Sequence, residues 1–138
     1  MIMPMLVVDD IKATMKFYIE KLNFTDGGTL DFEDGRLMMG FLNLGSNLLM
    51  IGVSETVTSP KGNGVEFYIG VDDDVDIDEY FNQVKANGAP LEGDIKTEFW
   101  GDRTFSLKDP DGYKMIFCKT VKEVSMEEAQ DIINTQPV

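Results

Sequence analysis

Glu66 is the polar side chain best placed for chemistry, because it interrupts an apolar stretch. Between residues 65 and 71, apolar side chains alternate with Glu66, Tyr68 and Gly70, and a period of two predicts a β-strand whose apolar face packs on a helix. A buried carboxylate in such a strand must be paired, protonated or used. Lys114 could pair with Glu66 in an ion pair of no catalytic meaning. The other interpretation makes Glu66 a polar anchor or a general base.

Histidine and cysteine, the residue types that most often bind zinc, are nearly absent. The chain has no histidine and one cysteine, Cys118. A thiolate and imidazole cluster for zinc is therefore excluded, as is an intramolecular disulfide. We interpret Cys118 as a packed thiol rather than a nucleophile.

Two further side chains have types suited to ligand contact. Phe99 and Trp100 precede a predicted strand, where the indole could overhang a binding surface and stack on an aromatic or cationic ligand. The alternative is a hinge residue packed between two halves of the chain. Arg103 is suited to binding an anion, but we expect it to pair with one of the many nearby carboxylates.

Composition limits the partners. The 138 residues suit a single domain and include 25 acidic and 12 basic side chains, for a net charge of −13, which disfavours nucleic acid and anionic membranes. Solubility is the simpler explanation of this charge, and attraction of a cationic ligand is the other. The apolar run Met1 to Val8 has no basic flank and meets Asp9 and Asp10. We therefore expect a cytoplasmic protein without a signal peptide or membrane span.

Residues 1–24 and 64–88 share one pattern of strand, acidic turn and amphipathic helix. Val8 and Val71 lie 63 residues apart, and each is followed by two aspartates, which we interpret as helix caps. Apolar spacings of three and four predict helices over 11–24 and 75–87.

After each predicted helix the hydrophobic period falls toward two. This predicts one hairpin from 36–42 and 47–53 and another from 103–108 and 113–119, with Asp109-Pro110-Asp111-Gly112 as a structural turn. Ser125 and Glu128 form a capping-box pattern that predicts a short helix through about Ile133.

These features together resemble the vicinal-oxygen-chelate superfamily, the group of glyoxalases, bleomycin-resistance proteins and extradiol dioxygenases. The resemblance spans about residues 3–119 and rests on Val8-Asp9-Asp10 with Phe17-Tyr18, on Trp100-Gly101-Asp102-Arg103, and on Asp109-Pro110-Asp111-Gly112-Tyr113. It implies an α+β fold, in which two βαβββ modules, residues 1–60 and 61–119, form a cupped mixed β-sheet with the helices outside. Residues 1–119 would be a single domain, and residues 120–138 a C-terminal extension with a short helix.

The resemblance also implies where a metal would be bound. Many members use a His or Gln on the first and fifth strands and a Glu on the fourth and eighth, and these positions map to Met3, Glu66, Met50 and Ile116. A hard divalent cation needs several oxygen or imidazole ligands. Glu66 is the only retained ligand-type residue, so we expect no divalent metal and no other cofactor.

The same mapping predicts which side chains line the cup, because residues two apart on a strand share a face. For any single methionine, filling the centre of the sheet is the simpler interpretation. Together, a mostly apolar lining with few polar groups is typical of a small-molecule site. The predicted lining consists of Met3, Met5, Val7, Met38, Gly40, Leu48, Met50, Gly52, Glu66, Tyr68, Gly70, Thr104, Ser106, Lys114, Ile116 and Cys118, with Trp100 above it.

Three functions are compatible with this sequence. The leading hypothesis is a metal-free small-molecule-binding protein of the bleomycin-resistance type, a homodimer that holds an organic or cationic ligand in an apolar, acidic cup. The alternative is an enzyme that uses Glu66 as base or ligand, either a glyoxalase-like lyase or isomerase or a metal-dependent dioxygenase-type enzyme. Glu33, Asp34, Glu92, Glu98 and Asp102 would be its reserve metal ligands. A third hypothesis is a dimerisation and partner-binding role without a small ligand.

Overall fold

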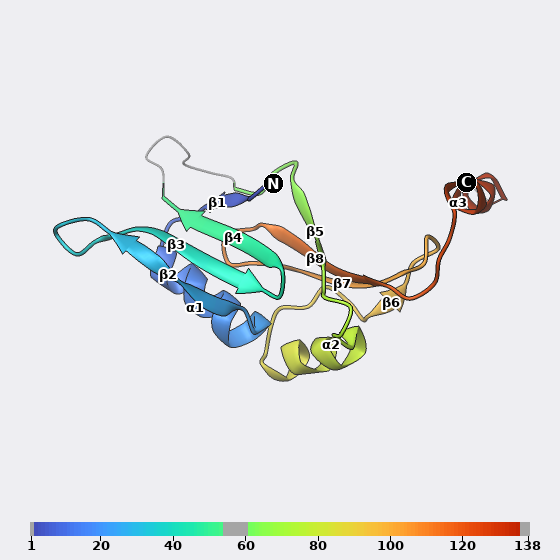
Figure 1. The fold of residues 1–138 in the computed structure, drawn as a ribbon, viewed down its shortest axis with the longest axis horizontal. Coiled ribbons are helices and arrows are strands. Elements are labelled where there is room, and N and C mark those ends of the chain that lie inside the picture. Colours follow the sequence, from blue (N-terminus) through green and yellow to red (C-terminus); the bar gives the residue numbers. More distant parts are fainter. Residues whose placement is uncertain (1, 54–60, 136–138) are drawn as a thin grey trace.

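The computed structural model describes residues 2–53 and 61–135. In these ranges the chain forms two four-stranded sheets and three helices (Figure 1). Sheet A has the strand order β1-β4-β3-β2 and sheet B the order β5-β8-β7-β6. The strands of sheet A are β1 (Met5–Val7), β2 (Thr25–Asp31), β3 (Leu37–Leu44) and β4 (Asn47–Gly52); those of sheet B are β5 (Glu66–Gly70), β6 (Lys96–Thr97), β7 (Asp102–Lys108) and β8 (Lys114–Thr120).

Each sheet is one βαβββ module. Helix α1 (Ile11–Leu22) follows β1, and α2 (Ile77–Ala86) follows β5. In both sheets the first strand pairs in parallel with the last, and the other pairs are antiparallel. The α+β fold of two βαβββ modules that the family resemblance implies is therefore confirmed.

The strand register shows that the repeat is structural. Met5 lies opposite Met50 between β1 and β4, and Tyr68 lies opposite Ile116 between β5 and β8. Met5 and Tyr68 are separated by the same 63 residues as the two valines of the sequence repeat.

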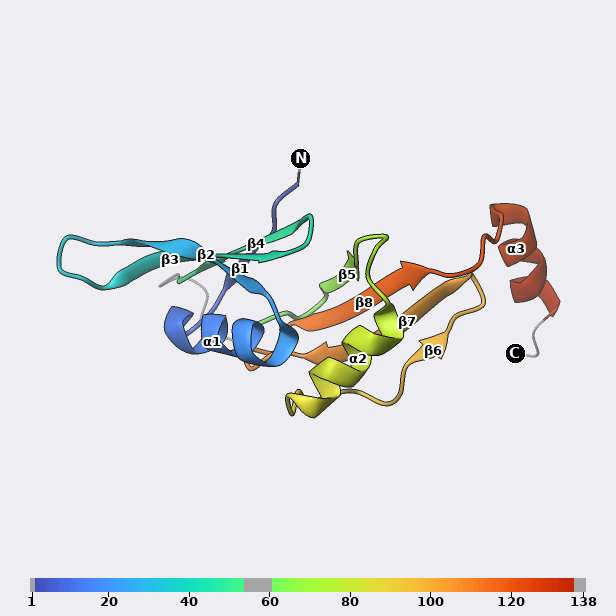
Figure 2. The same cartoon turned by 60° about the horizontal axis from the view of Figure 1, so that its bottom comes forward.

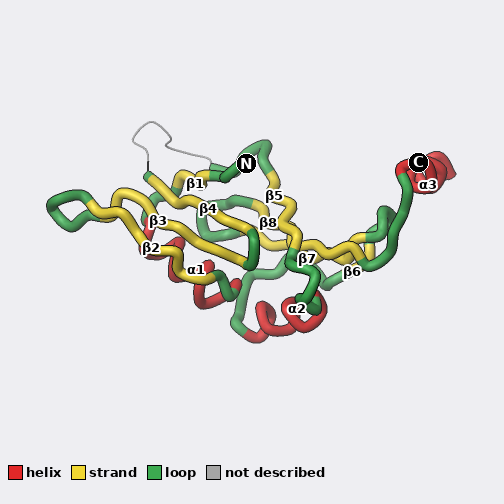
Figure 3. The backbone as a smooth tube through the Cα atoms, viewed as in Figure 1, coloured by secondary structure: helices red, strands yellow, loops and turns green. Residues whose placement is uncertain are grey.

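The two sheets lie beside each other along the long axis, with α1 and α2 on the same side of them (Figure 2). Helix α3 (Met126–Thr135) stands at the end of the molecule, beyond a loop that follows β8 (Figure 3). Ser125 accepts a hydrogen bond from the Glu128 amide (3.0 Å), so the predicted capping box is present. No described residue of α3 is buried.

The core lies between the helices and the sheets. The apolar stripe of α2 buries Ile77, Tyr80, Phe81 and Val84. On sheet B, Phe105 and Phe117 stack with their ring centroids 5.2 Å apart, and the Tyr80 ring lies 5.5 Å from each. These contacts fix sheet B against α2 and leave its other face open.

The helix caps differ between the modules. In α1, Asp10 accepts a hydrogen bond from the Ala13 amide (3.0 Å), as predicted. The prediction for α2 was wrong, because Asp76 is the cap and Asp72 instead accepts a hydrogen bond from the Ser46 hydroxyl (2.9 Å). The Val75 amide bonds to the Asp72 carbonyl, and this turn delays the start of the helix.

The turn at residues 109–112 joins the modules. Asp109 is 5% exposed and accepts a hydrogen bond from the Tyr18 hydroxyl of α1 (2.7 Å). Burial raises the pKa of Asp109 above its ordinary value, although the hydrogen bonds that its carboxylate accepts from the Tyr18 hydroxyl and from the Tyr113 amide oppose the effect. The Tyr113 hydroxyl donates to the Val7 carbonyl of β1 (2.8 Å). The structural role predicted for this turn is confirmed.

Within the described residues, no helix has the length and apolar character needed to cross a membrane.

Candidate functional site

The face of sheet B that points away from α2 carries most of the predicted polar site residues. Side chains paired across neighbouring strands share a face. The register therefore defines three rows, which we call the open face of sheet B: Glu66, Lys114 and Lys108; Tyr68, Ile116 and Ser106; Gly70, Cys118 and Thr104. The intervening residues Ile69, Phe105 and Phe117 are buried. The alternation of the sequence thus predicted this face of β5, β7 and β8 correctly.

Glu66 and Lys114 form the ion pair that the sequence suggested. The Lys114 Nζ and Glu66 Oε1 atoms lie 3.9 Å apart, and the side chains are 32% and 61% exposed. The expectation that Glu66 is buried was wrong, because β5 is an edge strand of sheet B and leaves one side of the row open. A pair in this setting contributes little to stability.

Two hollows lie along the open face. One, of about 160 Å³, is lined by the predicted residues Thr104, Ser106, Lys114 and Ile116 together with carboxylates that include Glu98. The other, of about 660 Å³, lies next to Glu66. Lys114 and Glu92 line both hollows, so the two hollows adjoin each other.

A chain of hydrogen bonds holds Trp100 at one end of this face. The indole Nε1 donates to the Tyr68 hydroxyl (3.0 Å), which donates to Asp102 Oδ2 (2.7 Å). The Thr120 hydroxyl donates to the other oxygen of Asp102 (2.8 Å). Partial burial and the bond to Asp102 raise the pKa of Tyr68 above its ordinary value, so the phenol keeps its proton at neutral pH and donates it to the carboxylate.

The partners of Trp100 decide between its two interpretations. Its ring contacts Phe99 edge to face at 4.9 Å, and its hydrogen bond goes to Tyr68 of β5. Both partners belong to the second module. These contacts favour a position at the open face of sheet B over a hinge between the modules.

Three other side chains have structural partners. The Thr104 hydroxyl donates to Glu98 (3.0 Å). Arg103 forms a bidentate pair with Asp78 of α2 at 2.7 to 3.0 Å, as expected from its acidic surroundings. Burial raises the pKa of Cys118 to about 11. The thiol therefore stays protonated, which supports its interpretation as a packed residue.

The prediction for the third strand was wrong by one residue. Met50 lies opposite Phe41, and Gly52 lies opposite Met39, so Phe41 and Met39 share the face of Met5 and Met50. Met38 and Gly40 belong to the face toward α1, where a Cβ on Gly40 would collide with the Met15 sulfur. Residues 37–42 are apolar on both faces, so no alternation fixes their phase.

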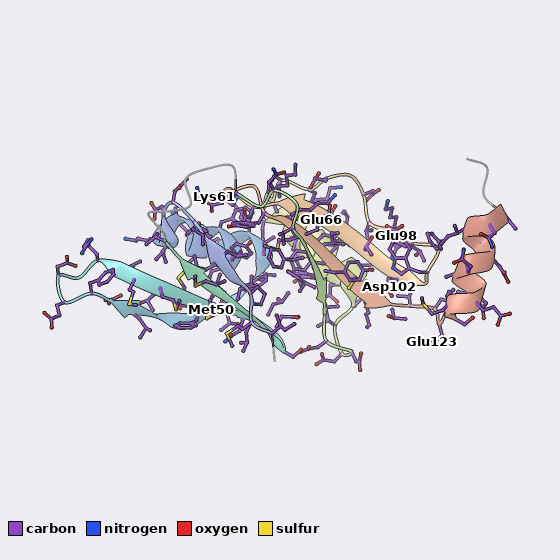
Figure 4. The ribbon with its side chains drawn as sticks, turned by 90° about the horizontal axis from the view of Figure 1, so that it is seen from above. Met50, Lys61, Glu66, Glu98, Asp102 and Glu123 are labelled. Atoms are coloured by element: carbon purple, nitrogen blue, oxygen red, sulfur yellow. The ribbon has the colours of Figure 1, made fainter. Side chains whose placement is uncertain are left out.

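The methionines and the polar residues occupy separate surfaces of one chain. Figure 4 shows Met50 on sheet A and Asp102 far from it on sheet B, with Glu66 between them. The residues that line the two hollows of sheet B include no methionine. The predicted cup is therefore divided into two open faces within a single chain.

The residues at the family's ligand positions do not fit a divalent metal. Met3, Met50 and Ile116 offer only thioether or alkyl groups, and these cannot complete a hard-cation site around Glu66. Among residues 2–53 and 61–135, no three His, Cys, Asp or Glu side chains lie close enough to hold an ion.

The reserve carboxylates do not replace the missing ligands. Asp34 pairs with Arg36 (2.6 Å), Asp102 accepts from Tyr68 and Thr120, and Glu98 accepts from Thr104. Glu92 lines the larger hollow together with Glu66, but two carboxylates alone do not supply the several ligands that a hard divalent cation needs.

A further hollow of about 310 Å³ lies where α2 meets the β3–β4 turn. It is acidic, but Asp72 binds Ser46 and Asp76 caps α2. Asp74 and Glu79 also line this hollow, but none of the residues predicted for the site does, so we place the candidate site on sheet B.

Sequence reasoning did not place Asp102, Lys108 and Lys61 around the site, although it named Asp102 as a reserve metal ligand. Asp102 and Lys108 share one face of β7 with Thr104 and Ser106, so the same period of two could have placed them there. Lys61 lines the larger hollow from a loop, and a loop residue leaves no periodic signal.

Comparisons with known proteins agree with this geometry. Residues 2–117 match the model of a family described as the Glyoxalase/Bleomycin resistance protein/Dioxygenase superfamily. The uncharacterized protein Mb0911c of Mycobacterium bovis is 29% identical over 142 residues, covering 96% of this chain and 91% of that protein.

Solved structures share the fold. TioX from Micromonospora sp. ML1 superposes with a TM-score of 0.68 at 20% identity, covering 86% of this chain and 97% of TioX. A glyoxalase/bleomycin resistance protein/dioxygenase from Alicyclobacillus acidocaldarius gives a TM-score of 0.67 at 19% identity, covering 88% and 91% of the two chains.

Proposed function

The chain belongs to the glyoxalase/bleomycin resistance protein/dioxygenase superfamily, and from this membership we propose that it binds a small organic molecule on the open face of sheet B, without a divalent metal. One observation carries the proposal. Thr104, Ser106, Lys114 and Ile116 line one hollow, and Lys114 also lines a larger hollow beside it. The lining is mainly polar and charged, with Ile116 as an apolar contact, and convergent polar groups of this kind orient a small molecule in a concave site.

Trp100 supports this proposal as a candidate ligand contact at the edge of the open face. The Tyr68 hydroxyl and the Phe99 ring fix the indole, while the residue stays 39% exposed. A rigid, partly exposed indole offers contact area to a ligand at a low cost in conformational entropy.

We further propose that a second copy of the chain completes the cup. The open face of sheet A exposes Met5 and Leu48 next to the half-buried Met50 and Phe41. An apolar patch of this kind is typical of an interface. In a twofold homodimer, sheet A of each copy would cover sheet B of the other and create two equivalent sites. Met3, Met5 and Met50 would then contact the ligand from the partner's side.

The enzyme alternative receives less support from the geometry. A general base at neutral pH works best when it is shielded from water or crowded by negative charge. Glu66 is 61% exposed and lies beside a lysine, so it has neither feature. A binding role also needs no metal ligands. The single domain over 1–119 and the cytoplasmic location stay predictions from the sequence.

A thermal-stabilisation screen with one blocking variant tests the proposal. A ligand raises the melting temperature only by binding the folded form preferentially. We expect hits among small organic molecules, with and without a chelator in the buffer. The Ser106→Phe variant fills the hollow beside Ile116 and should abolish the stabilisation. The control Asn82→Phe adds the same ring on the exposed side of α2 and should keep it.

Two results would overturn the proposal. Hits that stabilise wild type and Ser106→Phe equally bind elsewhere. Stabilisation that disappears with the chelator requires a metal.

A further inference from the structure

Lysines gather at one end of the open face of sheet B, against the charge of the chain as a whole. Lys61, Lys108 and Lys114 line the hollow of about 660 Å³, together with the carboxylates Glu66 and Glu92. Asp9 pairs with Lys61 from outside this lining, and the remaining two lysines and two carboxylates balance, so the hollow is much less negative than the chain as a whole, whose net charge is −13. Local charge, rather than net charge, decides which ligand group is attracted into a hollow.

The arrangement of two of these lysines is unfavourable without an anion. Lys108 and Lys114 are directly opposite each other on β7 and β8, and like charges in this position destabilise a sheet. The Glu66 carboxylate lies 3.9 Å from Lys114, which is beyond hydrogen-bond distance. It neutralises the pair only weakly, and a bound anion would relieve the repulsion.

The loop residues Lys61 and Gly62, which form one wall of the hollow, are held in place by specific contacts. The side chain of Lys61 is 5% exposed and pairs with Asp9 of the first module (2.7 Å). Gly62 has a φ of +73°, and a Cβ there would collide with the Gly112 carbonyl, so this loop packs directly on the β7–β8 turn. The part of the wall that Lys61 and Gly62 form is therefore fixed by contacts with Asp9 of the first module and with the β7–β8 turn.

The opposite end of the same face is acidic and aromatic. Thr120, which binds Asp102 beside Trp100, lies six residues along β8 from Lys114, or about 20 Å at the rise of a strand. Ile116 lies between the two ends. The open face thus changes from basic through apolar to aromatic and acidic along one strand.

We propose that the ligand carries an anionic group, a carboxylate or a phosphate, which Lys108 and Lys114 bind in this hollow while an apolar part lies over Ile116. This inference rests on the proposed function and names the ligand class. It also replaces the cationic ligand that the net charge suggested with an anionic one.

Four small probes test the inference on the full-length protein. Inorganic phosphate, phenyl phosphate and benzoate carry the anion, and benzamide is the neutral counterpart of benzoate. Amide chemical shifts in a nitrogen-15 NMR titration give both the dissociation constant and the location. We expect benzamide to bind at least about tenfold more weakly than benzoate, since a charge-assisted hydrogen bond is lost. A comparison of the two phosphate probes with benzoate separates recognition of a phosphate from recognition of a carboxylate.

Charge variants then identify the groups. Lys108→Gln and Lys114→Gln should each weaken anion binding by about tenfold or more. Lys16→Gln makes the same charge change on the exposed side of α1 and should leave it unchanged. Glu66→Gln should tighten anion binding, because it removes a competing negative charge from the hollow.

The outcomes separate this inference from the proposed function. If benzamide binds as tightly as benzoate and Lys108→Gln has no effect, the anion site is wrong while small-molecule binding stands. If no probe shifts the amides of sheet B, both proposals are wrong. Tighter binding in Lys108→Gln than in wild type would also overturn the anion site.

Discussion

Replacing Tyr68 with Phe tests the hydrogen-bond chain that positions Trp100. The variant removes the acceptor of the indole N–H and the donor to Asp102, at 3.0 and 2.7 Å. A buried charged hydrogen bond contributes about 1.5–3 kcal/mol, but Tyr68 is half exposed and water can replace both partners. We therefore expect a loss of about 1 kcal/mol in the free energy of unfolding, or about 3 °C in melting temperature for a chain of this size.

Trp100 reports on this change directly, because it is the sole tryptophan of the chain. Chemical denaturation gives the stability, and the emission spectrum of the folded protein should shift to longer wavelength as the freed indole becomes more hydrated. Tyr113→Phe is the matched control, since the Tyr113 hydroxyl bonds to the Val7 backbone at the module junction. It should lower stability without shifting the emission. Unchanged emission and stability in Tyr68→Phe would refute the reasoning.

Other variants test the elements around the site. Tyr18→Phe removes the hydroxyl that donates to Asp109 Oδ2 at 2.7 Å, while the Asp111 and Tyr113 amides still donate to Oδ1, and it should cost about 2 kcal/mol in a urea titration because the carboxylate is buried; a cost below 0.5 kcal/mol, taken as the order of a surface substitution, would contradict this. Because the pKa of Asp109 is raised in the folded state, wild type should lose stability relative to Asp109→Asn as pH rises from about 4 through the raised value; the opposite slope would show a lowered pKa. Gly101→Ala places a Cβ at a φ of +98° against the Lys122 carbonyl and should cost about 1–3 kcal/mol and shift the Trp100 emission, and an unchanged spectrum would argue against this packing. Deleting the chain from Met126 onward should change the unfolding free energy by less than about 0.5 kcal/mol, since no described residue of α3 is buried; a larger loss would show that the helix docks.

The fold was predictable because each module repeats its physical pattern. The step from Val8 to Val71 fixed the register of the repeat. Strict alternation then separated the two faces of β5, with Glu66 exposed on the open face and Ile69 buried on the other. The same reasoning failed on β3. Its residues are apolar on both faces, so the pattern could not show that Gly40 faces α1.

The site was only partly predictable, because it depends on contacts between distant segments. Alternation placed Thr104, Ser106 and Ile116 on one face, but it could not show that the methionines of sheet A lie apart from them (Figure 4). The bond from Tyr68 to Asp102 spans 34 residues. Lys61 enters the hollow from a loop, where sequence periodicity gives no direction.

The crystal structure of the protein with a hit from the stabilisation screen tests the central claim most directly. The account predicts the bound molecule against Ile116 and Thr104 on sheet B, below Trp100, with no metal ion beside Glu66. A ligand bound in the acidic hollow next to Asp72, or a metal ion coordinated by Glu66, would contradict it.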